Sequence, residues 1–221
     1  MADLYKLPLF PLDTVLFPGM VLPLNIFEPR YRLMIGRCVA ENKPFGVVLI
    51  REGSEVGGPA TPFDIGTTAY VTHYERLNDG RMHVQTVGYQ RFRINEVVQE
   101  KPYMEAMVQD YPIEGIDEPE VAGLVADLRA MLSKYLTALS DASDSGITFD
   151  EIPEDGMALA YFLSILVPFP IRDKQRLLEA VDLKDMLAIG QELLKREVIL
   201  LNHMIKLGYP NQDTSTFFSP N

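Results

Sequence analysis

The sequence predicts an α+β protein in which a β-rich half with one early helix precedes an all-helical half. In residues 1–115 the apolar side chains form short, mostly alternating runs separated by turn signals, a pattern typical of strands. In residues 116–210 they recur every three to four positions, as in amphipathic helices. We therefore expect a β-rich unit at 1–115, a helical unit at 116–210 and a flexible tail at 211–221.

The composition is that of a globular protein with excess negative charge. Hydrophobic residues make up 47% and charged residues 23%, and no apolar run reaches the ~18 residues that a membrane-spanning helix needs. Asp and Glu number 31 against 20 Lys and Arg, and the net charge of −11 repels nucleic acid and anionic membranes. The single cysteine, Cys38, and the absence of a signal-peptide pattern favour a cytoplasmic setting.

The opening segment, LPLFPLDTVLFPGMVLPLNIFEPRY at residues 7–31, is almost wholly apolar but contains five prolines. Proline has no N–H to donate to a sheet, so we expect short extended pieces at edges, bends or strand starts. Phe17-Pro18-Gly19-Met20 has Pro and Gly at the two central positions of a type II turn. From Pro29 the apolar residues take helical spacing, which predicts a short helix that ends before Pro44.

The remaining elements follow from the change of period along the chain. In the first half we expect strands at 45–50, 67–76, 82–87, 91–98 and 103–111. A loop at 52–66 and a hairpin turn at Asn78-Asp79-Gly80 separate some of them. In the second half we expect an acidic loop at 141–155 and four helices, at 121–139, from Asp155 to before Pro168, at 173–180, and at 183–207 with Asp182 as its cap.

A search for catalytic or metal-binding motifs finds none. The chain has no G-x-S-x-G, no H-E-x-x-H and no glycine-rich phosphate loop. His73 and His83 flank the predicted hairpin without a third metal ligand beside them. Cys38 lies on the apolar face of the first predicted helix, where a small core residue is expected. We therefore predict a protein that is not an enzyme and that needs no cofactor or metal.

The opening segment resembles the start of the Lon-protease N-terminal (LON substrate-binding) domain family. The segments PFGVVLI, GTTAYVTHYERLNDGRMHVQTVGYQRFRI, PYMEAMV and LAYFLSILVPFPIRDKQRLLEAVDLKDML also resemble that family, in the same order. The resemblance covers nearly all of residues 5–207. It implies a PUA-like fold, with an N-terminal six-stranded β pseudo-barrel, an inserted short helix and a C-terminal α-helical bundle.

The resemblance also implies a function. In full Lon proteases this domain recognises damaged or unfolded substrates and helps assemble the hexamer, and ATPase and peptidase modules follow it. Neither module is present in these 221 residues, so the resemblance implies a free-standing bacterial protein that binds unfolded or extended polypeptide, or a partner protein. The alternative is RNA binding, as in PUA domains. The acidic balance argues against it, and a cluster of Arg30, Arg32, Arg91 and Arg93 would favour it.

Two groups of residues in the opening segment stand out. Phe17 and Met20 are candidates for partner contact because a Pro-Gly turn tends to lie at the surface, although both can equally pack beneath it. The others are expected to shape the fold, with Phe27 buried and Glu28 paired with Arg30. These fold-shaping residues are Phe10, Pro11, Pro18, Gly19, Phe27, Glu28, Pro29, Arg30 and Tyr31.

Overall fold

The computed structural model describes residues 3–55, 60–99, 102–116, 118–143 and 152–206. The chain divides into two compact units, Met1–Pro112 and Ile113–Asn221, and each is described by itself. The predicted α+β class, with strands first and helices second, is confirmed. The expected tail at 211–221 lies outside the described residues. Among the residues described, no helix has both the length and the apolar character needed to cross a bilayer.

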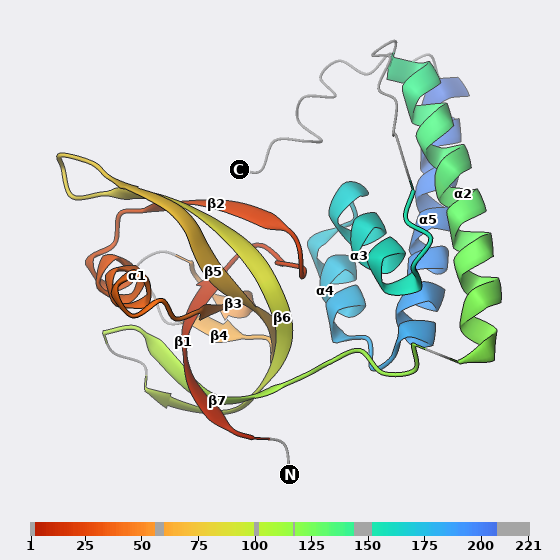
Figure 1. Cartoon of the computed structure of the whole chain (residues 1–221). Coiled ribbons are helices and arrows are strands. Elements are labelled where there is room, and N and C mark those ends of the chain that lie inside the picture. The colour runs from red at the N-terminus through yellow and green to blue at the C-terminus, as the bar shows by residue number, and fades with distance from the viewer. Residues whose placement is uncertain (1–2, 56–59, 100–101, 117, 144–151, 207–221) are drawn as a thin grey trace. The chain divides into compact units, whose positions relative to one another are not determined.

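The described residues of the first unit form seven strands and one helix (Figure 1). The strands are β1 (Tyr5–Leu12), β2 (Val21–Ile26), β3 (Phe45–Gly53), β4 (Ala60–Pro62), β5 (Ile65–Arg76), β6 (Met82–Gln99) and β7 (Met104–Asp110), and the helix is α1 (Pro29–Glu41). The number of strands exceeds the expected six by one, because the three-residue strand β4 lies in the segment predicted as a loop. A strand this short gives no periodic signal in a segment rich in Gly and Pro.

Five of these strands form a closed ring. The order β1–β7–β6–β5–β3 is antiparallel throughout, and β3 returns to β1 in a parallel pairing that places Leu9 opposite Gly46. Closure removes the unpaired edges of those strands over the paired residues. The other two strands lie outside the ring, with β2 paired to β6 and β4 paired to β3.

Helix α1 packs against one face of this sheet. Its buried residues are Tyr31, Met34, Ile35 and Cys38, which confirms the helical spacing read from the sequence. Pro29 occupies the first turn, where a missing N–H leaves no hydrogen bond unmade. The rings of Phe10 and Tyr31 lie with their centroids 4.1 Å apart, so that β1 and α1 share one core.

The predicted turn before β2 is also confirmed. Gly19 has a φ of +80°, which L side chains rarely adopt, and the Met20 N–H donates to the Phe17 carbonyl oxygen at 3.0 Å. The turn is held against β6, since the Gly19 N–H donates to the Gly88 carbonyl and the Gly88 N–H donates to the Met20 carbonyl, both at 2.9 Å. Two residues thus face one across the ladder, which is a β-bulge.

In the second unit the described residues form four helices, which are α2 (Pro119–Ser143), α3 (Gly156–Leu166), α4 (Ile171–Glu179) and α5 (Leu183–Lys206). Two predicted caps are confirmed. Asp155 accepts a hydrogen bond from the Ala158 N–H at 2.8 Å, and Asp182 accepts one from the Asp185 N–H at 2.7 Å. Helix α2 extends into the segment expected as an acidic loop, of which residues 144–151 lie outside the described part of the chain.

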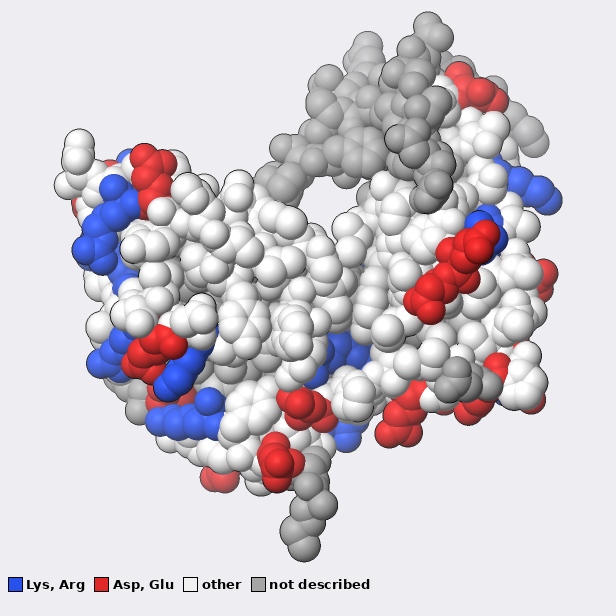
Figure 2. All heavy atoms as spheres, viewed as in Figure 1, with Lys and Arg blue, Asp and Glu red and all other residues white. Residues whose placement is uncertain are grey.

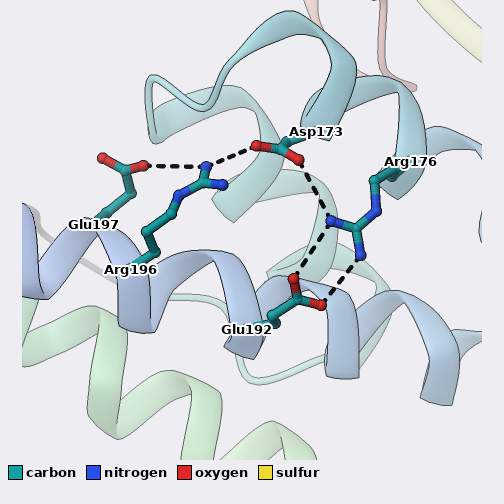
Figure 3. Close-up of polar contacts among 5 residues, drawn as sticks. All are labelled: Asp173, Arg176, Glu192, Arg196 and Glu197. Carbon is teal, nitrogen blue, oxygen red and sulfur yellow. Dashed lines mark hydrogen bonds and ion pairs between the residues drawn. The ribbon is translucent and has the colours of Figure 1, made fainter.

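An ion-pair network joins α4 to α5 (Figure 3). Asp173 at the start of α4 lies 2.7 Å from Arg196 and 3.4 Å from Arg176. Arg176 also contacts Glu192 at 3.1 Å, and Arg196 contacts Glu197 at 3.4 Å. The Asp173 side chain is only 15% exposed and serves two guanidinium groups, so it is the centre of the network.

We expect Gly88→Ala to destabilise the β-rich unit by about 1–3 kcal/mol, because the added methyl group would collide with the carbonyl oxygen of Phe17, a backbone atom that cannot rotate away. Gly36→Ala is the matched control. Its methyl group meets nothing within 4 Å and lies inside α1, so it should stabilise by about 0.5–1 kcal/mol. Urea unfolding measures both, and equal midpoints for the two variants would contradict this account.

We expect Asp173→Asn to lower the free energy of unfolding of the helical unit by about 1 kcal/mol, because both arginines lose their shared carboxylate. The loss should shrink in 1 M NaCl, where ions screen partly exposed pairs. Glu192→Gln, which removes a single exposed partner, is the control and should cost less. Urea titration followed by far-UV circular dichroism tests this, and the expectation fails if the cost is the same at both salt concentrations.

Candidate functional site

The candidate site is the free edge of β2. This strand pairs antiparallel with the first part of β6, with Val21 opposite Val87 and Ile26 opposite Met82. On its other side, no strand of the described chain pairs with it. The same part of β6 pairs on its far side with β5, from Tyr70 to Arg76, so the three strands form a ribbon that leaves the closed ring (Figure 1).

The hydrogen bonds at the start of β2 show which main-chain groups face this free edge. The Met20 carbonyl already bonds to Gly88, and alternate residues of an antiparallel strand bond to the same neighbour. The residues paired through their main chains with β6 are therefore Leu22, Leu24 and Ile26. Those that direct their N–H and C=O groups outward are Val21, Pro23 and Asn25, and all three are exposed. Pro23 thus stands where its missing N–H disrupts no pairing.

The opposite edge of the ribbon is better protected. Residues Tyr70–Arg76 of β5 pair with β6 alone within the described chain, and they include His73, Glu75 and Arg76. A register shift between Val71 and His73 interrupts this edge further. Charges and bulges are common means of protecting an edge from pairing with another strand. The β2 strand has no charged residue, so it is the more open of the two edges.

The ribbon face beside this edge is apolar and exposed. Val21 is 59% exposed and lies opposite Val87, which in turn lies opposite Tyr70. The Tyr70 ring meets Tyr89 in an edge-to-face contact with centroids 5.6 Å apart. Figure 2 shows that this part of the β-rich unit is almost without charge. The site therefore combines unpaired main-chain groups with an apolar surface.

Phe27 follows the other end of β2, and the expectation that it is buried is wrong. Its side chain is 51% exposed and lines a cavity of about 220 Å³ together with Asn25, Arg81, Met82 and His83. The alternation along β2 explains this position, because Leu22, Leu24 and Ile26 point inward and the next odd position points outward. The period of two could have identified Phe27 as a surface residue.

The two residues predicted to contact a partner, Phe17 and Met20, are buried to different extents. Phe17 is fully buried, so its assignment to partner contact is wrong: the turn lies against β6, which encloses the ring. Met20 is half-buried and packs against the core cluster, so it contributes little free apolar surface. Both side chains pack beneath the turn, which is the alternative that the sequence left open.

The fold-shaping residues surround α1 and the turn. Phe10, Pro11 and Tyr31 are buried, Pro18 is half-buried, and Pro29 starts the helix. Glu28 and Arg30 form the expected ion pair, with 3.0 Å between Oε2 and Nε. The Arg30 guanidinium also lies 4.5 Å from the centroid of the Tyr31 ring.

The four arginines considered for RNA binding do not form one basic surface. Arg30 pairs with Glu28, and Arg32 donates to the Gly80 carbonyl at 3.0 Å. Arg91 is buried on β6 and donates to the carbonyls of Tyr111 and Pro112, both at 3.1 Å. Arg93 lies 4.4 Å from the centroid of the Tyr111 ring. Their contacts hold the fold together.

The described cysteine and the two histidines of the ribbon show no catalytic arrangement. Cys38 is buried, and burial, together with the Glu41 carboxylate, raises the pKa of its thiol to about 11. His73 and His83 both lie on the ribbon, but each stands opposite another residue, Gln85 and Glu75 respectively. Within the described ranges no three His, Cys, Asp or Glu side chains are grouped closely enough to hold a metal.

The described residues combine a small closed β-ring and an accessory edge strand with a helical unit. A model of the ATP-dependent protease La (LON) substrate-binding domain matches residues 6–196. The chain belongs to this family.

Among solved structures, the Lon N-terminal domain protein from Xanthomonas campestris superposes with a TM-score of 0.61 at 26% identity, covering 83% of this chain and 95% of that one. The N-terminal domain of the Mycobacterium avium complex Lon protease superposes with a TM-score of 0.68, covering 86% and 98%. At 20% identity the second likeness concerns the fold alone.

Curated relatives agree with the family. The chain is 30% identical over 204 residues to the Lon protease of Anaeromyxobacter dehalogenans, covering 90% of this chain and 24% of that protein. It is 31% identical over 204 residues to Lon protease 2 of Myxococcus xanthus, covering 90% and 25%. The chain thus spans about a quarter of the length of these relatives.

We expect Cys38 to resist alkylation in the folded protein. With its pKa raised to about 11, roughly a thousandth of the thiol is ionised at pH 8, and the thiolate is the form that reacts. Iodoacetamide labelling followed by mass spectrometry should show slow reaction of the native protein and rapid reaction in 8 M urea. Equal rates in the two conditions would show that the thiol is accessible in the native fold.

Proposed function

We propose that this protein binds extended or unfolded polypeptide along the free edge of β2 and carries out no catalysis of its own. The observation that supports this most directly is an uncharged, exposed strand edge that the described chain leaves unpaired. Membership of a substrate-binding domain family supports the same function. A partner protein that offers an extended segment would satisfy the same chemistry. The single cysteine fits a cytoplasmic setting.

The proposed mode of binding is strand addition. An incoming segment would donate N–H groups to the carbonyls of Val21, Pro23 and Asn25, and it would accept hydrogen bonds from the N–H groups of Val21 and Asn25. Main-chain hydrogen bonds of this kind do not depend on the side chains of the ligand. They therefore suit a protein that binds many different unfolded chains. Specificity for apolar segments would come from Val21 and Phe27 beside the edge.

The affinity should be modest, with a dissociation constant of about micromolar or weaker, because ordering a flexible chain offsets much of the contact energy. Binding needs no nucleotide in this scheme. RNA is not proposed as a ligand, since the comparisons offer no support for it and the four arginines do not form one basic surface.

The test is fluorescence anisotropy with labelled lactalbumin that has been reduced and carboxymethylated. We expect this unfolded chain to bind and the native, disulfide-bonded form to bind much more weakly. The double variant Val21→Ser/Phe27→Ser should lose about tenfold in affinity, because it removes the two exposed apolar side chains beside the edge. Both residues are more than half exposed, so the fold should remain intact.

Tyr74→Ser is the matched control. Tyr74 is 48% exposed and lies on β5, at the protected edge of the same ribbon, so its loss should change the affinity less than about twofold. Equal loss in both variants would show that the β2 edge has no special role. Equal and negligible binding of unfolded and folded lactalbumin would refute the proposal, and tight binding of single-stranded RNA that weakens steeply with salt would favour RNA instead.

A further inference from the structure

A second cavity of the β-rich unit lies between α1 and the turn that joins β5 to β6. Its volume is about 590 Å³. One wall is formed by α1, and the other by the ends of β5 and β6 with the intervening Gly80. The Arg32 side chain spans the two walls, since its Nη1 donates to the Gly80 carbonyl at 3.0 Å. This bond holds the turn against the helix and keeps the cavity at a defined width.

Three arginines line this cavity in a chain whose net charge is −11. Arg32, Arg37 and Arg76 take part in none of the ion pairs found among the described residues. Arg32 and Arg37 bond instead to neutral oxygens, the Gly80 carbonyl and the Tyr103 hydroxyl. The cavity therefore has three positive charges, and Glu41 is the one carboxylate among its lining residues.

The acidic groups near the cavity already have cationic partners. Glu41, which also lines it, lies 2.7 Å from Lys43. Asp79, next to Gly80, lies 2.7 Å from Arg81. Figure 2 shows basic side chains, with acidic ones beside them, along the end of the unit that bears α1 and this turn. Three arginines against one lining carboxylate, which is itself paired with Lys43, leave the field inside the cavity positive.

The floor of the cavity is apolar. Leu33, Gly36 and Ala40 follow one another along α1 at helical spacing, and Leu33 is 42% exposed. Gly36 has open space where a side chain would be, so nothing fills the floor at that position. The volume lies in the range that holds a drug-sized organic ligand, which is larger than a single inorganic anion. The fitting ligand thus has a negative group joined directly to an apolar body.

We propose that this cavity binds the C-terminal carboxylate of a polypeptide, with the apolar side chain of its last residue on the α1 floor. The inference rests on the proposed function, because it assigns a second contact to the same class of ligand. A chain terminus places a carboxylate and a side chain on one carbon atom, as this arrangement of charge and apolar surface requires. The guanidinium fork matches the two oxygens of a carboxylate.

The experiment compares two apolar ten-residue peptides of one sequence without Asp or Glu, each labelled at the N-terminus. One ends in a free carboxylate and the other in an amide. We expect the free acid to bind about tenfold more tightly, the usual effect of a hydrogen bond to a charged group. Arg76→Gln and, separately, Arg37→Gln should remove most of that difference and leave the affinity for the amide unchanged.

Lys184→Gln, an equal change of charge at an exposed position on α5, is the control and should preserve the difference. Equal affinities of the acid and the amide, both measurable, would overturn this inference and leave the proposed function standing. Loss of the difference in the Lys184 variant would also overturn it, since the effect would then be one of net charge. If neither peptide nor unfolded lactalbumin binds, both proposals are refuted.

Discussion

The structure of the first unit depends on β6, which belongs both to the closed ring and to the outlying ribbon. Its 18 residues are too many for the closed ring alone, so the strand begins in the outlying ribbon and ends in the ring, where it pairs with β7. The bulge at Gly88 marks the change, because the close approach of Phe17 leaves no room for a side chain there. The free β2 edge and the cavity behind the β5–β6 turn both exist because the ribbon leaves the ring.

Much of this architecture could be predicted from local patterns. The type II turn at Pro18-Gly19, the amphipathic face of α1 and the caps at Asp155 and Asp182 each depend on a few neighbouring residues with strong preferences. The family could be recognised from the same segments, since prolines at defined spacing shape the backbone. Ring closure between β1 and β3 could not be predicted, because parallel pairing across the intervening chain has no local signal.

The candidate site could be predicted only in part. The sequence favours surface exposure for Phe17, because of its turn, and burial for Phe27, because it lies where the proline-rich segment meets the first helix. The structure shows the reverse. Which face of a turn is covered depends on the strand beside it, and that contact is remote in sequence. Phe27 had a usable signal in the alternation of β2. No local sequence pattern could have identified the arginines of the cavity, because Arg32 and Arg76 come together only when the hairpin folds over α1.

Pro23 gives the open edge of β2 a further property, which concerns its behaviour toward copies of itself. If two such edges met about a two-fold axis using all their outward residues, Pro23 would face Pro23, and both central hydrogen bonds would lack a donor. When a foreign segment without proline pairs with β2, only the hydrogen bond that the missing Pro23 N–H would donate is lost at this position. The residue thus makes the strand a poor partner for itself, and the protein can keep an uncharged edge exposed without building sheets that extend from molecule to molecule.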